Sequence, residues 1–400
     1  MPMPTLNAKR FAYGWFDFAS SSVTLIFHAY LFPLYVKQYV FGNRPAGDTA
    51  WGAMFAVSLL LAAAIAPFIG RYVDGRERFR VFAALGALSF VCMLVLGLAV
   101  GAPAPVVVIA FVMANVSFYL VSNVYDSLLT IVADANERSA VSSFAWGFGY
   151  VGGVLAFLVV FFVQRRVGIA SPWPYLFTAV FYAVFGAWSL IRLRPLVHGY
   201  IRVNKVGFRG MLAALTRDRR RNLVGYWLVG DCVNAVIVFT GIYAATQLKM
   251  SATAIGLILM AVQTLAFPGT IVMNSVATRI GLLMALRICG AIWCVIILIL
   301  VFGRSYVAIG VVVVLTSLVI GSTQALMRAQ YSMAVERART SELFGWYAIA
   351  TESATFLAPL LFGLIAGVAL NQRLAMAALG VPLVFGMLLL TDGDNSGSAA

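Results

Sequence analysis

Four carboxylates stand within stretches of sequence that are otherwise apolar: Asp17, Asp126, Asp231 and Glu352. An ionisable side chain inside an apolar helix is costly to bury, so its first interpretation is functional. A buried carboxylate can hold a proton, bind the cationic group of a ligand or pair with an arginine. These three kinds of chemistry define the hypotheses for the site.

Two of the acids belong to polar stripes, in which polar side chains recur every three or four residues. The first stripe is Asp17, Ser21, Thr24 and His28, and the second is Asn115, Tyr119, Ser122 and Asp126. Such spacing places the residues on one helix face, which must point to the protein interior or to an aqueous path. Asn234 follows Asp231 after one turn. The expected substrate or proton site comprises Asp17, Ser21, Thr24, His28, Asn115, Tyr119, Asp231, Asn234 and Glu352.

These assignments have structural alternatives. Asp17 and Asp126 lie near the ends of their segments, where a salt bridge to Arg138 or another loop arginine would close a gate. Both roles are open for Asp17, whereas the gate is favoured for Asp126. His28 could be a packed core histidine rather than a proton relay, and Glu352 could be a proton site or a partner of Arg328.

A second group of residues occupies the polar turn after the second apolar segment. Gly70 would let a neighbouring helix approach closely. Asp74 could cap the N-terminus of another helix and pair with arginines as a gate closes. The alternative is a charge cluster that only sets the membrane topology. The expected gating residues are Gly70, Asp74, Arg76, Asp126 and Arg138.

The composition places all these segments in a membrane. Of 400 residues, 62% are hydrophobic and 10% are charged, and a soluble domain could not bury so much apolar surface. The net charge of +14 comes from basic residues in short loops, which favours membrane topology over nucleic-acid binding. The sequence has no Gly-Lys-Ser/Thr phosphate loop and no metal-ligand spacing. We therefore expect neither an enzyme nor an ATP-driven pump, and no cofactor or metal.

Hydropathy, punctuated by glycine, proline and charge, predicts an all-α membrane protein with twelve transmembrane helices. The expected ranges are 11–36, 51–73, 80–100, 104–127, 140–163, 173–193, 222–246, 252–278, 282–302, 305–329, 342–369 and 374–391. They predict an N-terminal six-helix bundle (1–193), a basic linker (194–221), a C-terminal six-helix bundle (222–391) and a disordered tail (392–400). A short amphipathic helix is expected within the linker, near Phe208–Leu215.

The distribution of lysine and arginine predicts the orientation. With both termini inside, the cytoplasmic side holds 21 of these residues and the outside holds 7. This bias places both termini in the cytoplasm of a multi-pass protein of the inner (plasma) membrane.

An internal repeat relates the two sets of helices. Phe144 and Trp146 recur as Phe344 and Trp346, each pair following a Glu-Arg dipeptide at a similar distance. Two homologous halves are typical of transporter scaffolds. With the basic linker between them, the halves resemble the major facilitator superfamily (MFS), and the turn with Gly70 and Asp74 is similar to its signature loop. The resemblance implies an MFS fold of two pseudo-symmetric bundles around a cavity edged by Asp17 and Asp231.

Five segments, in order along the chain, resemble one branch of that superfamily, the Atg22-like/UMF1 group. They are Phe11–Ser21 with Phe32–Tyr35, Tyr125–Leu129 with Glu137–Gly153, Asp231–Ile237, Ser341–Ala348 and Phe356–Gly363. Glu352 departs from the group, which usually has a basic residue there, and this leaves the charge of the substrate open.

Eukaryotic members of this group are vacuolar amino-acid effluxers. The resemblance therefore implies a secondary active transporter that works by alternating access. It is expected to export a small polar metabolite such as an amino acid, with coupling to protons. The alternatives are an efflux pump for hydrophobic cations and a non-transporting membrane receptor on the same scaffold. The expected partners are a small-molecule substrate, protons and the lipid bilayer, with no nucleic acid, and the chain is expected to be a monomer.

Overall fold

The computed structural model describes most of the chain. The described residues are 5–42, 44–74, 76–197, 208–246, 252–303, 305–354 and 372–391, with the single positions 250, 361 and 365. The predicted tail 392–400, the middle of the predicted linker and most of the second half of the predicted helix 342–369 lie outside this set. The chain forms two compact units, and each is described by itself.

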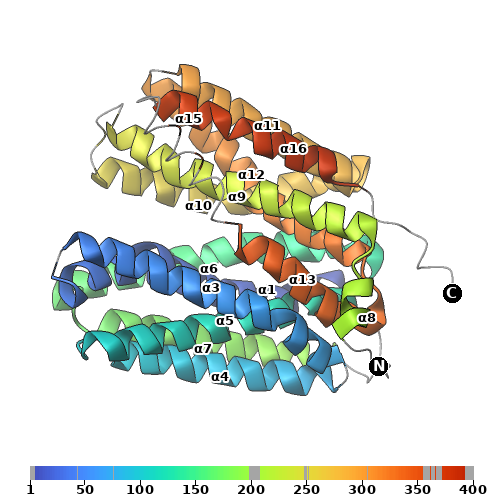
Figure 1. Cartoon of the computed structure of the whole chain (residues 1–400), viewed down its shortest axis with the longest axis horizontal. Coiled ribbons are helices and arrows are strands. Elements are labelled where there is room, and N and C mark those ends of the chain that lie inside the picture. The colour runs from blue at the N-terminus through green and yellow to red at the C-terminus, as the bar shows by residue number, and fades with distance from the viewer. Residues whose placement is uncertain are drawn as a thin grey trace. The chain divides into compact units, whose positions relative to one another are not determined.

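Unit 1 comprises Met1–Asp134, Phe148–Asn204 and Arg337–Gly345. Its first helix is built from α1 (Leu6–Val23), η1 (Thr24–Tyr30), α2 (Leu31–Tyr35) and η2 (Val36–Val40). There follow α3 (Pro45–Asp74), α4 (Arg78–Leu98), α5 (Ala104–Val132), most of α6 (Arg138–Val167) and α7 (Trp173–Leu193). Figure 1 shows α3, α4, α5 and α7 side by side in blue to green, and α1 packs on α7.

Unit 2 comprises Ala135–Gly147, Lys205–Glu336 and Trp346–Ala400. Its described helices are α8 (Phe208–Ala213), α9 (Arg217–Thr246), α10 (Ala252–Ile280), α11 (Leu282–Phe302), α12 (Tyr306–Met333), most of α13 (Thr340–Glu352), α15 (Gln372–Ala378) and α16 (Gly380–Leu389). The α12 helix packs on α10 and α11, and α16 packs on α9 (Figure 1).

Within the described ranges, nine helices are long and apolar enough to span a bilayer, and Arg373–Leu389 is a shorter apolar segment. Two predicted spans, 173–193 and 282–302, agree with α7 and α11 at both ends. Others run further than predicted: α5 continues to Val132 and α12 to Met333. Polar residues near the ends of α5 and α12 interrupt the apolar pattern, so the sequence predicts shorter spans. In the structure such side chains, for example Thr130 and Gln330, are buried and hydrogen-bonded.

The first membrane helix departs from α-helical geometry in two places. It passes through π-helical turns at Thr24–Tyr30 and Val36–Val40. Pro33 lies between these turns and cannot donate a backbone hydrogen bond, so the regular ladder is interrupted near it. Because π turns rotate the helix face, the polar stripe that begins at Asp17 does not continue on one straight line to His28.

Close helix contacts depend on glycines at specific positions. Gly152 of α6 lies against the Phe18 carbonyl of α1, and a Cβ there would overlap the carbonyl oxygen. In unit 2, Gly269 of α10 lies in the same way against the Ser317 carbonyl of α12. These glycines let neighbouring backbones touch without a hydrophobic driving force between helices.

The two units exchange short segments at the start of two helices. The first turns of α6, within Ala135–Gly147, belong to unit 2, although the rest of α6 belongs to unit 1. Conversely, Arg337–Gly345, with the first turns of α13, belongs to unit 1. These exchanged segments carry the two copies of the Phe-x-Trp repeat at or next to their ends, and each is anchored in its host unit by a polar network.

Candidate functional site

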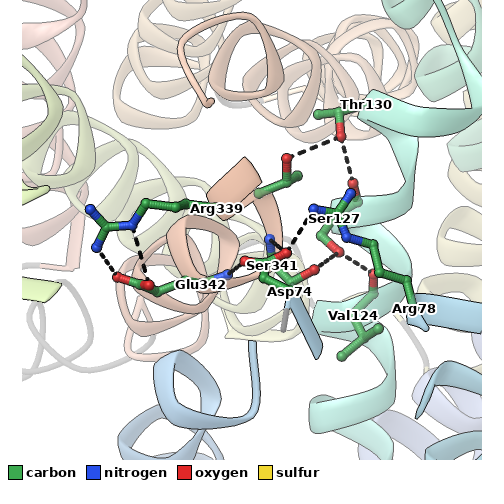
Figure 2. A network of polar contacts seen from close by, with 9 residues as sticks. Asp74, Arg78, Val124, Ser127, Thr130, Arg339, Ser341 and Glu342 are labelled. Carbon is green, nitrogen blue, oxygen red and sulfur yellow. Dashed lines mark hydrogen bonds and ion pairs between the residues drawn. The ribbon is translucent and has the colours of Figure 1, made fainter. Parts of the chain in front are cut away.

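The carboxylate of Asp74 caps the start of α13 in unit 1. One oxygen, Oδ1, accepts a hydrogen bond from the backbone N–H of Ser341 at 3.0 Å, and Oδ2 accepts one from Glu342 at 2.8 Å. Figure 2 shows this carboxylate directed at the first turn of the helix. The first N–H groups of a helix have no partner within it and carry a partial positive charge, so an anion there is doubly favourable.

The same carboxylate pairs with an arginine. Arg78 Nη2 lies 3.0 Å from Asp74 Oδ1, and both side chains are almost fully buried, at 5% and 1% exposure. Arg76, the arginine expected at this place, instead stacks over Tyr72 at 4.2 Å and is exposed. A buried ion pair of this kind holds a geometry strongly, because losing either partner leaves an uncompensated charge.

Hydroxyl groups extend this network along the first turns of α13. Ser127 and Ser341 exchange a hydrogen bond between their Oγ atoms at 2.9 Å, and Thr130 donates to Thr340 at 3.4 Å (Figure 2). The neighbouring Arg339 forms an ion pair with Glu342 on α13 itself.

Shape complementarity accompanies these polar contacts. A Cβ at Gly70 of α3 would overlap the Ser341 carbonyl, and one at Gly345 of α13 would overlap Pro67. Asn123 of α5 donates to the Phe344 carbonyl at 2.9 Å. The start of α13 therefore lies tightly against α3 and α5 within unit 1.

Unit 2 holds the start of α6 with arginines. Arg328 of α12 is 2% exposed; it donates from Nε to Ser142 Oγ at 2.9 Å and from Nη2 to the Ser142 carbonyl at 3.2 Å. Ser142 in turn donates to the Ala325 carbonyl at 2.8 Å. The Arg328 guanidinium also lies over the Trp146 ring, 5.5 Å from its centroid.

Two further contacts fix the same segment. Arg138 donates to the Ser332 carbonyl at 2.6 Å and is 7% exposed, and Ser139 donates to Asn274 Oδ1 at 2.7 Å. The two networks are thus repeat-related in position but differ in chemistry. A carboxylate holds α13 by its N–H groups, whereas two arginines join α6 to α12: Arg328 of α12 donates to Ser142, and Arg138 of α6 donates to the Ser332 carbonyl.

The polar stripe of the first helix divides into two environments. Its first part, Asp17 and Ser21, faces α6: a Cβ at Gly149 would lie 2.7 Å from Ser21 Oγ and 3.1 Å from the Asp17 carbonyl. Thr24, the next position, is exposed.

Asp126 of α5 is half-buried, and its carbonyl accepts from the Tyr13 hydroxyl at 3.4 Å.

His28 lies in an aromatic environment. Its ring stacks on Tyr119 with centroids 5.8 Å apart and meets the edges of Phe55 and Phe118 at 5.3 and 5.5 Å. The amide of Asn115, one turn before Tyr119 on α5, donates to Ser58 of α3. The structure therefore brings together three expected residues, His28, Asn115 and Tyr119, in unit 1.

In unit 2 the expected residues lie on α9 and at the end of α13. Asp231 is 1% exposed, and Asn234 donates to the Ala354 carbonyl at 2.8 Å. Trp227, one turn before Asp231, donates to the Ser353 carbonyl at 3.2 Å. Glu352 is half-buried immediately before these two carbonyls, so α9 and this part of α13 share one polar region.

Several residues of the networks were not expected as site residues from the sequence. Ser127, Ser142 and Ser341 carry no charge and have no distinctive spacing, so only the fold reveals them. Arg328 and Arg78 gave a usable signal, since a buried arginine in or beside an apolar segment needs a partner. Trp146 and Trp346 gave another, because they occupy equivalent places in the repeat. Within the described part of the chain, both keep a buried indole N–H without a hydrogen-bond partner.

Comparison with solved structures identifies the fold. The chain superposes on FucP, a major facilitator superfamily transporter described as the E. coli fucose:proton symporter. The TM-score is 0.76 and the identity 11%, over 95% of this chain and 97% of that one. Human MFSD10, described as an organic anion transporter, gives a TM-score of 0.73 at 14% identity, over 97% and 100%. These likenesses confirm the predicted fold class, an all-α membrane protein with the MFS fold.

Sequence comparison identifies the family. The model of the family described as "Vacuole effluxer Atg22 like" matches residues 38–396, and the chain belongs to this family. YxiO of Bacillus subtilis (strain 168), described as an uncharacterized MFS-type transporter, is 22% identical over 405 residues, covering 94% of this chain and 92% of that protein. The Atg22-like resemblance seen in the sequence is confirmed, and with it the predictions that the chain is an MFS secondary transporter and not an enzyme.

Proposed function

We propose that this protein exports a small zwitterionic metabolite, such as an amino acid, by alternating access with coupling to protons. The observation that carries the proposal is the pair of exchanged helix starts, each held by a compact polar network. A transporter of this class must close one end of its path and later release it. Networks of a few hydrogen bonds, joined in unit 1 by the ion pair of Asp74 and Arg78, are suited to both steps.

The expected gating residues take part in this closure as we propose it. Asp74, with Arg78, would hold α13, and Gly70 would allow the close approach. Arg138, with Arg328, would hold α6. Arg76 and Asp126 would act at the edge of the same region. The lysine and arginine count supports placing this end, with both termini, on the cytoplasmic side of the plasma membrane.

A zwitterion fits the buried charges of unit 2. Asp231 on α9 would bind the ammonium group, and Asn234 and Glu352 lie in the same polar region. Arg328 on α12 and the indole N–H groups of Trp146 and Trp346 would bind the carboxylate. Hydrogen bonds from such donors to a carboxylate are strong when they are shielded from water. Asp17 would supply the repeat-related acid from unit 1, as a second cation or proton site.

This arrangement links binding to gating. Arg328 holds Ser142 at the start of α6, so a substrate carboxylate that draws on the same guanidinium would weaken the hold on α6. A ligand shifts a conformational equilibrium only through such differential contacts. Occupancy of the site would then favour opening.

Proteoliposomes loaded with an amino-acid mixture, under an imposed pH gradient, test the proposal through efflux and internal pH. We expect efflux of one amino-acid class with accompanying proton movement. Asp231→Asn and Asp17→Asn should reduce the flux, whereas Asp134→Asn, which removes an exposed acid paired with Lys9, should not. Absence of flux for every class, together with wild-type behaviour of both intramembrane variants, would sink the proposal.

A separate experiment tests the proposed contacts of the two indole N–H groups with the substrate carboxylate. Trp346→Phe and Trp146→Phe keep the ring but remove the donor, so we expect a raised KM with a smaller change in kcat. Trp173→Phe, at an exposed tryptophan at the start of α7, is the matched control. An unchanged KM in both site variants contradicts the assignment.

A further inference from the structure

A cavity of about 860 Å³ lies at the end of unit 2 where α9 begins and α16 ends. Its polar part is formed by Arg217, Arg220 and Arg221, with Asp218. Its apolar part is formed by Val224 of α9 and by Phe385 and Leu389 of α16. The transport site proposed above does not include any of these residues.

The charge of this lining favours an anion. The lining contains three guanidinium groups and a single carboxylate, so its net charge is positive. Arg220 donates from Nε to the Leu215 carbonyl at 2.8 Å, and Arg221 donates from Nη2 to the Leu388 carbonyl at 3.0 Å. A guanidinium carries five N–H donors, so one anchoring bond fixes its position and leaves donors for a phosphate.

The apolar wall of the cavity is formed by exposed side chains. Phe385 is 55% exposed and Val224 is 45% exposed. Val224 lies one turn after Arg220 and Arg221 on α9, and Phe385 lies in the shorter apolar segment Arg373–Leu389. Arginines at the boundary of a span, above exposed apolar side chains, match a phospholipid, whose phosphate and acyl chains are joined in the same order.

A second groove on α16 repeats the pattern more weakly. It has a volume of about 370 Å³ and is lined by Gly290, Ala291 and Cys294 of α11 with Val384, Met387 and Leu388, and Arg287 is its single charged residue. Gly290 is required for its shape, because a Cβ there would lie 2.7 Å from Met387 Cγ. Grooves on two sides of α16 thus combine basic and lipid-facing apolar residues.

We propose that the arginine-lined cavity between α9 and α16 binds the headgroup of an anionic phospholipid, whose acyl chains lie along Val224, Phe385 and Leu389. The contact would hold the end of α16 against the start of α9. It is independent of the transported substrate, so it can hold or fail without affecting the proposed function.

The test uses the full-length protein in detergent, titrated with phosphatidylglycerol or phosphatidylcholine and followed by native mass spectrometry. The wild type is expected to bind phosphatidylglycerol in preference. Each arginine near a membrane surface contributes about a fivefold factor, so Arg217→Gln with Arg220→Gln and Arg221→Gln should weaken this binding on the order of a hundredfold. Binding of phosphatidylcholine should not change.

The matched control removes three positive charges at positions outside the cavity. Arg80→Gln with Arg194→Gln and Arg279→Gln replaces three exposed arginines outside the cavity and should leave the preference intact. If the triple cavity variant does not fold, Arg217→Gln alone, at an exposed side chain, should still show about a fivefold loss. Equal losses in both triple variants, no preference in the wild type, or equally tight binding of inorganic phosphate alone would each overturn the proposal.

Discussion

At the scale of single residues, the contact between Asp74 and α13 combines three interactions in one carboxylate. Its two oxygens accept separate N–H groups, and one oxygen also meets Arg78. Asparagine at this position could still accept one bond but would carry no charge, and its amide group would face an N–H donor. Arg78 would then be buried without its carboxylate.

Asp74→Asn is therefore expected to lower the free energy of unfolding by roughly 3 kcal/mol, the scale found when one partner of a buried pair is removed. Thermal unfolding in detergent, with and without denaturant, measures the change. The control is Glu77→Gln, which removes the partner of Arg80 in an exposed pair, with exposures of 50% and 81%. Such pairs contribute little, so equal destabilisation by the two variants would contradict this account.

At the scale of helices, the sequence predicts the ranges of the helices more accurately than their internal geometry and their side-chain contacts. The ranges of α7 and α11 were predicted to the residue, because apolar length and flanking charges define a span directly. The π-helical turns around Pro33 were not predicted, because nothing in residue type separates them from an α-helix containing proline. The role of Ser127 or Ser142 depends on which helix lies opposite, which a single sequence does not state.

The close approach of α3 and α13 gives the prediction at this scale. Gly70→Ala places a methyl group where the Ser341 carbonyl lies, so the start of α13 cannot keep its position. We expect slower transport and faster maleimide labelling of a thiol introduced by Ser127→Cys, in a background without the four native cysteines.

The same helix provides the control. Gly52→Ala adds a methyl group where nothing lies within 4 Å, so transport and labelling should match the parent protein. Unchanged labelling in Gly70→Ala would show that α13 does not depend on this contact.

At the scale of the whole molecule, the division into units differs from the division of the sequence. The repeat predicts a boundary in the basic linker. Residues 1–134 and 148–204 belong to unit 1, and residues 205–336 and 346–400 belong to unit 2. The exchanged segments 135–147 and 337–345 are the exception. No sequence pattern marks them as belonging elsewhere, since their contacts join residues far apart in the chain, such as Asp74 with Ser341, which are 267 positions apart. The repeat nevertheless marked their location through Trp146 and Trp346.

The alternating access proposed above requires these segments to leave their host units during the cycle, and a disulfide tests this requirement. Ser127→Cys with Ser341→Cys places two thiols where the hydroxyl oxygens are hydrogen-bonded at 2.9 Å, so the two side chains point toward each other and can form a disulfide. Oxidation should stop transport and reduction should restore it, because a bond there prevents α13 from leaving α5.

The control pair is Ser189→Cys with Ala12→Cys, which joins α7 to α1 within unit 1, where Ser189 Oγ lies 3.2 Å from the Ala12 carbonyl. Oxidation of that pair should leave transport intact, since both helices belong to the same half. Transport that continues with the first pair fully oxidised would mean that the start of α13 stays in place throughout the cycle.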